Sequence, residues 1–226
     1  MLLKNLIKNS PQNLKELKIK GLALNSNQVK KGYIFFALKG NKSNGEDYIG
    51  KAIKNGAILI ICSKKCKFQS SKIYILKVNN VRNLLINITD KYYKIKPRNI
   101  IAVTGTNGKT SVAEYFYQIL NKNKIPVASI GTLGIKFKSQ RIKTSLTTPD
   151  IITLHKYLEI IKKNKIDNVI IEASSHGLYQ KRLNKLNIKA AIFTNFSQDH
   201  LDYHKTMKSY FQAKMILFSK LLKEKK

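Results

Sequence analysis

The chain has 226 residues, and 43 Lys and Arg stand against 12 Asp and Glu, which gives a formal net charge of +31 at pH 7. Hydrophobic residues make up 43% of the chain and charged residues 24%, which excludes the collagen-like and disordered classes. No apolar run approaches the ~20 residues that span a bilayer, and the start has no secretory signal pattern. We therefore expect a globular, cytoplasmic protein that makes no membrane contact.

The positive charge comes almost wholly from lysine. The chain contains 39 Lys, 30 Ile and 21 Asn. These three residue types share A- and T-rich codons, so a biased genome accounts for the excess without any partner. Arginine, which recognises phosphates and guanines in a bidentate manner, is rare, and the lysines are dispersed over the whole chain. We expect no nucleic acid as the primary partner.

The first third of the chain predicts a small α/β unit. Strands are expected at residues 33–38, 57–62 and 73–78, with helices at residues 47–55 and 81–93. Cys62 and Cys66 have no second pair that would complete a zinc site, so we expect two reduced thiols near a strand end. Pro97, in a polar stretch before a new buried strand, marks the expected domain junction, which gives domains at residues 1–97 and 98–226.

The second part alternates strands and helices and predicts a three-layer αβα domain with a parallel sheet. Its elements are expected in chain order, with helices at residues 109–120, 150–164 and 205–222 and strands at residues 99–104, 127–130, 168–173 and 189–194.

The motif T-G-T-N-G-K-T at residues 104–110 follows an apolar strand and opens a helix. In this context glycines let backbone N–H groups face a phosphate, Lys109 neutralises the β- and γ-phosphates, and the Thr110 hydroxyl can bind Mg²⁺. The strict P-loop pattern is not met, because its first glycine would fall on Val103. The placement between strand and helix nevertheless favours a phosphate loop over an accidental turn.

Two further segments follow predicted strands. Glu172 ends a buried strand, where a carboxylate is well placed to hold Mg²⁺ beside a phosphate loop. The Ser-Ser-His run that follows has no G-x-S-x-G elbow, so a hydrolase is disfavoured. His200 and His204 lack the glutamate of a zinc H-E-x-x-H motif. Thr147, Thr148 and Asp150 are, on the residues alone, a helix cap.

The motifs occur in one order along the chain: T-G-T-N-G-K-T, G-T-L-G, T-T-P-D, E-A-S-S-H-G-L, T-N-F-S-Q-D-H-L-D-Y-H, and then Gln212, Ala213 and Lys214. In this combination the chain closely resembles the Mur ligases. Residues 24–45 resemble the UDP-binding domain of that family, so the resemblance covers nearly the whole chain. Asn25 and Asn27 depart from it, because the family commonly has an acidic and a basic residue there.

The resemblance implies an ATP-dependent, amide-forming ligase of peptidoglycan synthesis that acts as a monomer. The histidine-containing motifs are most similar to the branch that adds a diamino acid, by family prevalence meso-diaminopimelate, to UDP-N-acetylmuramoyl-L-alanyl-D-glutamate. The family's carboxy-terminal amino-acid-binding domain has no counterpart here. One alternative is a nucleotide- or UDP-sugar-binding remnant without ligase activity. The related folate and cyanophycin ligases are disfavoured, because a UDP-type domain would have no purpose in them.

The resemblance also assigns residues. For ATP binding it implies Gly105, Thr106, Asn107, Gly108, Lys109, Thr110 and Ser111. For the UDP-muramoyl-dipeptide it implies Leu24, Ser26, Asn41, Lys42, Ser43, Thr147, Thr148, Ser174, Gln180 and Arg182. For Mg²⁺ it implies Thr110, Glu172, His200 and Lys214. Lys214 would be carbamylated, because an ammonium group repels Mg²⁺ whereas a carbamate supplies oxygen ligands, and catalysis would rest on Lys109, His200 and this modified Lys214.

Overall fold

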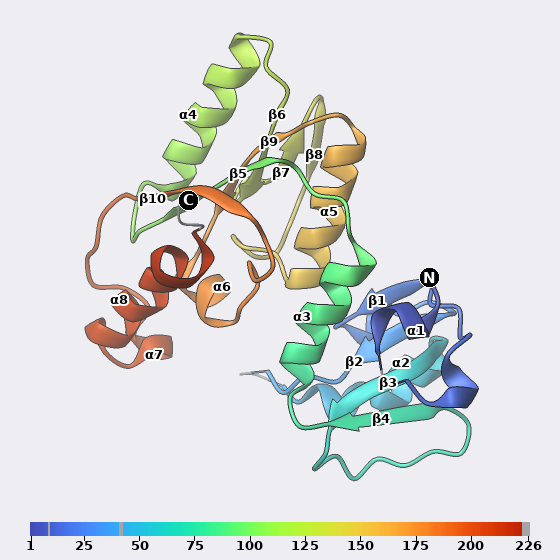
Figure 1. Ribbon diagram of the computed structural model, residues 1–226. Coiled ribbons are helices and arrows are strands. Elements are labelled where there is room, and N and C mark those ends of the chain that lie inside the picture. The colour runs from blue at the N-terminus through green and yellow to red at the C-terminus, as the bar shows by residue number, and fades with distance from the viewer. Residues whose placement is uncertain (9, 41–42, 223–226) are drawn as a thin grey trace. The chain divides into compact units, whose positions relative to one another are not determined.

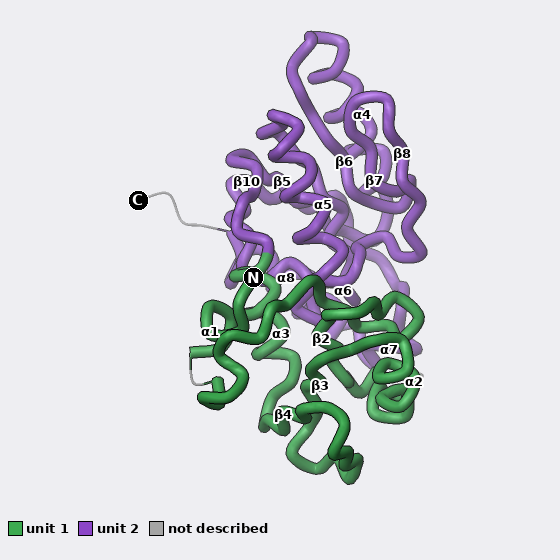
Figure 2. The backbone as a smooth tube through the Cα atoms, turned by 90° about the vertical axis from the view of Figure 1, so that its right-hand side faces the viewer, with its two compact units in different colours: residues 1–92 green, residues 93–226 purple. Residues whose placement is uncertain are grey.

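The computed structural model describes residues 1–8, 10–40 and 43–222, and it divides into two compact units, Met1–Tyr92 and Tyr93–Lys226 (Figure 1 and Figure 2). Both units are α/β, as predicted. The division falls ahead of the junction expected near Pro97. The Arg98 and Asn99 backbone N–H groups donate to Asp167, both at 2.9 Å, which holds the residues after Pro97 in the second unit.

The first unit contains a four-stranded parallel sheet in the order β1 (Gly21–Ala23), β2 (Tyr33–Phe36), β3 (Ala57–Ser63), β4 (Tyr74–Val78). Helices α1 (Leu3–Leu6), α2 (Ile49–Lys54) and α3 (Val81–Tyr92) complete it. Phe35, Ile60 and Cys62 form one core with α2. Cys62 and Cys66 are buried free thiols and therefore pack as small apolar residues. Burial raises the pKa of Cys62 to about 12.

The second unit is built on a six-stranded sheet in the order β10-β5-β9-β6-β7-β8. Strands β10 (Ile188–Phe193), β5 (Asn99–Thr104), β9 (Asn168–Glu172) and β6 (Val127–Gly131) are parallel. A hairpin of β7 (Gly134–Phe137) and β8 (Gln140–Ile142) continues the sheet in antiparallel pairing. The helices are α4 (Lys109–Lys122), α5 (Ile151–Lys163), α6 (Ser175–Tyr179), α7 (Leu201–His204) and α8 (Met207–Ile216).

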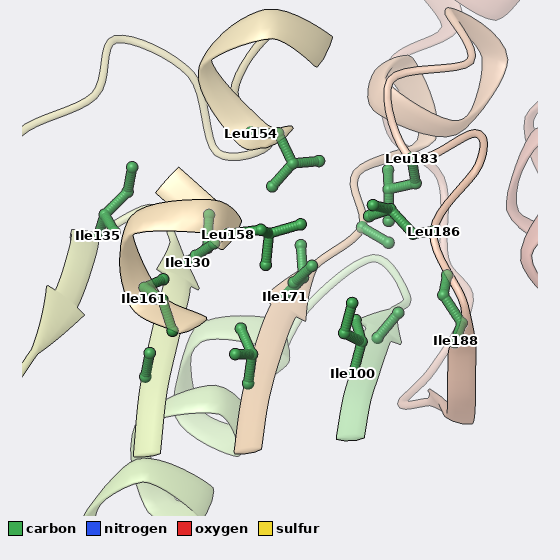
Figure 3. Packing of buried hydrophobic residues seen from close by; sticks show 14 of the residues in the cluster. Ile100, Ile130, Ile135, Leu154, Leu158, Ile161, Ile171, Leu183, Leu186 and Ile188 are labelled. Carbon is green, nitrogen blue, oxygen red and sulfur yellow. The ribbon is translucent and has the colours of Figure 1, made fainter. Parts of the chain in front are cut away.

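Helices cover both faces of this sheet, which confirms the three layers. Alternate residues of β5 point to opposite sides. Ile100 packs in a core with Leu154 and Leu158 of α5 (Figure 3), whereas Val103 packs against Ala113 of α4. The buried core therefore lies on both sides of β5 and β9, and the loops at their carboxyl ends are left to form a site.

One expected helix was wrong in its extent, and some short strands were not predicted. The closing helix does not run unbroken over residues 205–222, because Thr206 caps α8 by accepting the Ser209 backbone N–H at 3.1 Å, and a π-helical turn (Leu217–Leu221) follows. The β7–β8 hairpin and the short strand β1 were not predicted, since both lack a long apolar run. Asp150 does cap α5, accepting from the Ile152 and Thr153 backbone N–H groups. Among the described residues, no helix is long and apolar enough to cross a membrane.

Candidate active site

The loops that follow β5, β9 and β10 meet at one edge of the sheet. Val103 of β5 is paired with Glu172 of β9, and Thr104 with Phe193 of β10, so the three parallel strands end together. A cleft of about 230 Å³ opens there. It is lined by Thr106, Asn107, Gly108, Lys109, Thr110, Ser111, Thr132, Thr147, Ser174, Ser175, His200 and Lys214. The structure thus brings most of the predicted ATP residues into one cleft with His200 and Lys214.

The loop between β5 and α4 is held in shape by the segment after β10. The Asn107 backbone N–H donates to Asn195 Oδ1 at 2.9 Å, and Thr194 Oγ1 donates to the Asn107 carbonyl at 2.6 Å. Gly105 has φ +145°, and a Cβ on it would lie 1.9 Å from Thr194 Oγ1, so only glycine fits. Gly108, at φ +82°, turns the chain into α4. These constraints produce a preformed phosphate loop at a helix start.

Two lysine amines converge on this loop. Lys109 Nζ donates to the Gly105 and Thr106 carbonyls at 2.9 and 2.7 Å, and Lys214 Nζ donates to the same Gly105 carbonyl at 2.6 Å. Burial lowers the pKa of both amines, that of Lys214 to about 8, with the charge of Lys109 as a second cause. Lys214 is 1% exposed and also lies 4.2 Å from the centre of the Tyr210 ring. The cleft therefore concentrates positive charge where a polyphosphate would sit.

Glu172 is the buried carboxylate beside these amines. It is 1% exposed and accepts three hydrogen bonds, from Thr110 Oγ1 at 2.8 Å, from the Thr132 backbone N–H at 3.0 Å and from Thr132 Oγ1 at 3.1 Å. A buried carboxyl group is tolerated when its oxygens are hydrogen-bonded in this way. The predicted pairing of the phosphate loop with an acidic strand end is thus a direct contact.

The donors near the loop fit Mg²⁺. Thr110 and Glu172 present a hydroxyl and a carboxylate oxygen 2.8 Å apart, both hard ligands that this cation prefers. His200 lines the same cleft, with its Nδ1 3.5 Å from Asp199 Oδ1. Over the described ranges, no three His, Cys, Asp or Glu side chains gather closely enough to hold a metal alone. A cation here would depend on the threonine and on ligands outside that set.

The predicted dipeptide residues of the second unit form one hydrogen-bonded group. Thr148 Oγ1 donates to the Glu172 carbonyl at 2.6 Å and accepts from the Ser174 backbone N–H at 2.9 Å. Arg182 Nη1 donates to the Thr148 carbonyl at 2.5 Å, and Arg182 Nη2 donates to Gln180 Oε1 at 2.7 Å. Thr147 is linked to Thr132 by hydroxyl oxygens 3.1 Å apart. This group adjoins the phosphate loop through Glu172.

In the first unit a second hollow of about 370 Å³ is lined by Leu24, Asn25, Ser26, Asn27, Phe35, Leu38, Ser43, Gly45, Tyr48 and Lys51. Three residues predicted to bind the UDP moiety, Leu24, Ser26 and Ser43, are thereby brought together. Asn41 and Lys42, predicted for the same role, lie outside the described residues.

Two histidines near His200, namely His176 and His204, were not assigned a role from the sequence. His176 lies with its ring centre 4.8 Å from that of His200 and 5.4 Å from that of His204. Burial lowers the pKa of His176, and lowers that of His204 to about 4. His204 Nε2 lies 3.0 Å from Ser175 Oγ, but an imidazole with so low a pKa is a weak base, which argues further against a hydrolase.

Sequence reasoning also missed Thr132, Asn195 and Tyr210. Thr132 supplies two of the three hydrogen bonds to Glu172, and the G-T-L-G motif after β6 was its only signal. Asn195 supports the phosphate loop, and Tyr210 donates to Thr106 Oγ1 at 3.3 Å. Such supporting contacts depend on tertiary packing and have no spacing of their own.

Two family models match this chain. The Mur ligase middle domain matches residues 103–226, and the model described as Mur ligase family, catalytic domain, matches residues 18–100. The chain belongs to the Mur ligase family. Its phosphate loop, Glu172 and Lys214 all lie in the Mur ligase middle domain. The resemblance of the motifs is thereby confirmed, as is the α/β fold class.

Among curated Mur ligases, the UDP-N-acetylmuramoyl-L-alanyl-D-glutamate–2,6-diaminopimelate ligase of Rickettsia prowazekii (strain Madrid E) is 42% identical over 215 residues, which cover 93% of this chain and 44% of that protein. The ligase of the same name from Brucella melitensis biotype 1 is 39% identical over 213 residues, 94% of this chain and 44% of that protein. The chain thus spans less than half the length of the curated relatives it matches.

Solved structures of Mur ligases have the same fold as this chain. A UDP-N-acetylmuramoyl-L-alanyl-D-glutamate–2,6-diaminopimelate ligase superposes with a TM-score of 0.79 at 30% identity, covering 96% of this chain and 45% of that one. MurF ligase from Thermotoga maritima in complex with ADP superposes with a TM-score of 0.58 at 26% identity, covering 90% of this chain and 44% of that one.

Proposed function

We propose that this chain supplies the UDP-sugar-binding and ATP-binding domains, residues 1–97 and 98–226, of an ATP-dependent ligase of peptidoglycan synthesis. The ligase adds meso-diaminopimelate to UDP-N-acetylmuramoyl-L-alanyl-D-glutamate in the cytoplasm and acts as a monomer. One observation carries the proposal. The preformed phosphate loop is hydrogen-bonded through Thr110 to the buried carboxylate of Glu172, and the Lys109 and Lys214 amines both donate to the Gly105 carbonyl of this loop. The identity to the diaminopimelate ligases supports the choice of substrate.

The reaction joins a carboxylate to an amine in two steps. An oxygen of the D-glutamyl side-chain carboxylate attacks the γ-phosphorus of ATP, and ADP leaves with the electron pair of the broken P–O bond. The amine of the diamino acid then attacks the acyl carbon, phosphate leaves, and the amine loses a proton. Phosphoryl transfer needs positioning and neutralisation of charge rather than covalent help from the protein.

Lys109 and the loop amides perform that neutralisation. Lys109 Nζ donates to two loop carbonyls. Phosphate oxygens that replace these neutral acceptors form a charge-assisted hydrogen bond with the ammonium group. Asn107, Gly108 and Ser111 line the same cleft and direct the start of α4 at the phosphates. Thr106 instead supports the loop, because its hydroxyl donates to the Ser197 carbonyl at 3.1 Å.

Thr110, Glu172 and His200, together with a carbamylated Lys214, would hold Mg²⁺. When bound, Mg²⁺ supplies neutralisation of the phosphate charge during transfer. The residues around Glu172 prepare this set, because Thr132 fixes both carboxylate oxygens before any ligand arrives. Preformed orientation of this kind lowers the cost of assembling the site.

Lys214 is suited to carbamylation by its environment. Only a neutral amine attacks CO₂, and the pKa of about 8 makes that form far more abundant near neutral pH than for an ordinary lysine. The amine adds to the carbon of CO₂, and one proton is released as the carbamate forms. The nitrogen retains one hydrogen, so its bond to the Gly105 carbonyl can persist in the modified residue.

The dipeptide would be bound by Thr147, Thr148, Ser174, Gln180 and Arg182. Arg182 already donates to Gln180 and Thr148, and its guanidinium suits a carboxylate of the D-glutamyl residue. Leu24, Ser26 and Ser43 would bind the uridine end in the hollow of the first unit. Asn41 and Lys42 are predicted from the sequence for the same role.

The same cleft supports an alternative, a protein that binds nucleotide without ligation. The described residues that line the cleft all belong to the second unit, so the alternative assigns nucleotide binding to that unit. The two functions separate in a coupled assay, because only a ligase releases phosphate from ATP in a manner that depends on both the UDP-muramoyl-dipeptide and the diamino acid.

Titration calorimetry with ADP and Mg²⁺ tests nucleotide binding, which both the ligase and the alternative require. The variant Lys109→Ala should abolish measurable binding, whereas Lys156→Ala, at an exposed position on α5, should bind as the unaltered chain does. Binding that is undiminished in Lys109→Ala contradicts the phosphate-loop assignment. Phosphate release that requires the dipeptide substrate and diaminopimelate would then decide between ligase and nucleotide-binding protein.

A further inference from the structure

Helix α7 lies between the phosphate-loop cleft, which His200 lines, and the hydrogen-bonded group of Gln180 and Arg182. It begins immediately after His200, on the nucleotide side, and its third residue is Tyr203. The Tyr203 hydroxyl lies 3.0 Å from Gln180 Nε2, next to the group that contains Arg182 and Thr148. No motif assigned Tyr203 a role, and it is not among the residues that line the cleft.

The donors of Arg182 identify which end of the Gln180 amide is the oxygen. A guanidinium has donors only, and Arg182 Nε and Nη2 lie 3.2 and 2.7 Å from Gln180 Oε1, so the oxygen must face the arginine. The amide nitrogen must then face Tyr203, whose hydroxyl oxygen acts as the acceptor. Because the oxygen accepts here, the hydroxyl hydrogen of Tyr203 can be donated to another oxygen atom.

The Tyr203 ring is held by its neighbours on α6. Its centre lies 4.1 Å from the centre of the His176 ring and 5.9 Å from that of Tyr179, which is perpendicular to it. The backbone of Gln180 is fixed as well, because it caps α6 and Lys181 adopts the left-handed conformation, with the Arg182 backbone N–H bonded to the Gly177 carbonyl at 2.9 Å. The Gln180 side-chain amide is oriented by its hydrogen bonds to Tyr203 and Arg182.

We propose that Tyr203 is a positioning residue for recognition of the peptide carboxylate: its hydroxyl fixes the Gln180 amide, which in turn orients the Arg182 guanidinium. This inference rests on the proposed function, because it takes an acidic peptide as the ligand of Arg182. Without the Tyr203 oxygen, the Gln180 amide loses the hydrogen bond from its Nε2 to that hydroxyl. The amide oxygen is then held less firmly toward Arg182, and the guanidinium, which keeps its bond to the Thr148 carbonyl, is aimed less firmly.

Affinity measurements with two probes test this role. The probes are UDP-N-acetylmuramoyl-L-alanyl-D-glutamate and UDP-N-acetylmuramoyl-L-alanine, which lacks the glutamyl carboxylates. In Tyr203→Phe, Kd for the first probe should rise roughly 3- to 10-fold, the usual worth of one hydrogen bond. Kd for the second should stay unchanged, because the uridine end is bound elsewhere. Tyr179→Phe, which removes a hydroxyl from the ring that packs on Tyr203, is the matched control and should change neither Kd.

A double-mutant cycle separates positioning from general loosening. If Tyr203 acts through Gln180, then adding Tyr203→Phe to Gln180→Ala should cause no further loss of affinity for the dipeptide probe. Equal Kd values for Tyr203→Phe and the unaltered chain would overturn the inference alone, as would an equal loss for both probes. Failure of the unaltered chain to bind the dipeptide probe would remove the proposed function, and the inference with it.

Discussion

Lysines whose backbone adopts the left-handed conformation lower the free energy of unfolding of the chain relative to glycine at the same positions. Lys124 and Lys165 follow α4 and α5 with φ of 58° and 62°. In each case the helix ends in a Schellman motif, seen in the bond from the Ile125 N–H to the Leu120 carbonyl at 2.9 Å and from the Ile166 N–H to the Ile161 carbonyl at 3.3 Å. That motif normally has glycine at this position, because a Cβ is strained there.

The variants Lys124→Gly and Lys165→Gly should therefore be more stable. The left-handed conformation costs an L-residue about 1–2 kcal/mol, while glycine loses about 0.5–1 kcal/mol more backbone entropy on folding. The difference leaves a gain of about 0.5–1 kcal/mol for each variant. Because α4 and α5 cover opposite faces of the sheet, the two gains should add in the double variant.

Urea unfolding followed by circular dichroism measures the free energy of unfolding for each variant. Lys156→Gly is the control, since Lys156 is exposed in the interior of α5 and a glycine there should cost about 1 kcal/mol. The reasoning is refuted if Lys124→Gly and Lys165→Gly lose stability as the control does, because the sign should depend on φ alone.

Three further predictions concern the site. A Cβ in Gly131→Ala would lie 2.0 Å from Glu172 Oε1 and displace that carboxylate. In the presence of Mg²⁺ this variant should bind ADP roughly tenfold more weakly, because a charge-assisted contact is lost, and the loss should be much smaller without Mg²⁺. Equal losses with and without Mg²⁺ in calorimetry would contradict this prediction. Because the pKa of Lys214 is about 8, its neutral amine becomes more abundant from pH 7 to pH 9, and the carbamate signal from ¹³C-bicarbonate in NMR should grow over this range. The signal should be absent in Lys214→Arg. No signal at pH 9 in the unaltered chain would contradict carbamylation. His204, with its pKa lowered to about 4, binds a proton more readily when unfolded, so stability should fall as pH drops from 6.5 toward 4, and His204→Gln should flatten that slope in urea unfolding at pH 5 and pH 7.

Apolar runs predicted the buried strands well, because a short run such as Val169, Ile170 and Ile171 is typical of a strand covered on both faces. Helix ends were predicted less well. The helix expected to end at residue 120 continues to Lys122, since its stop signal is Asn123 and Lys124 rather than glycine. A lysine-rich composition thus hides the turns that glycine would reveal, at positions where tertiary contacts enforce φ above zero all the same.

The site was predictable to the extent that its residues follow strands directly. Thr110 and Glu172 come from elements that must meet at the carboxyl edge of the sheet, and they are in contact. Lys214 lies on a helix far along the chain, and only its resemblance to the family singled it out among 39 lysines. Its burial against Gly105 depends on how α8 packs, which no local pattern contains.

The segment after β10 explains why these distant residues act as one site. Thr194 and Asn195 bond the phosphate loop, His200 lines the cleft, and Tyr203 reaches the Gln180–Arg182 pair. A change in the phosphate loop therefore acts on the same short segment whose Tyr203 contacts a side chain proposed to bind the peptide. Since that segment lacks regular structure between β10 and α7, its shape is fixed by these hydrogen bonds, and filling the loop with phosphate should also stiffen the support of Arg182.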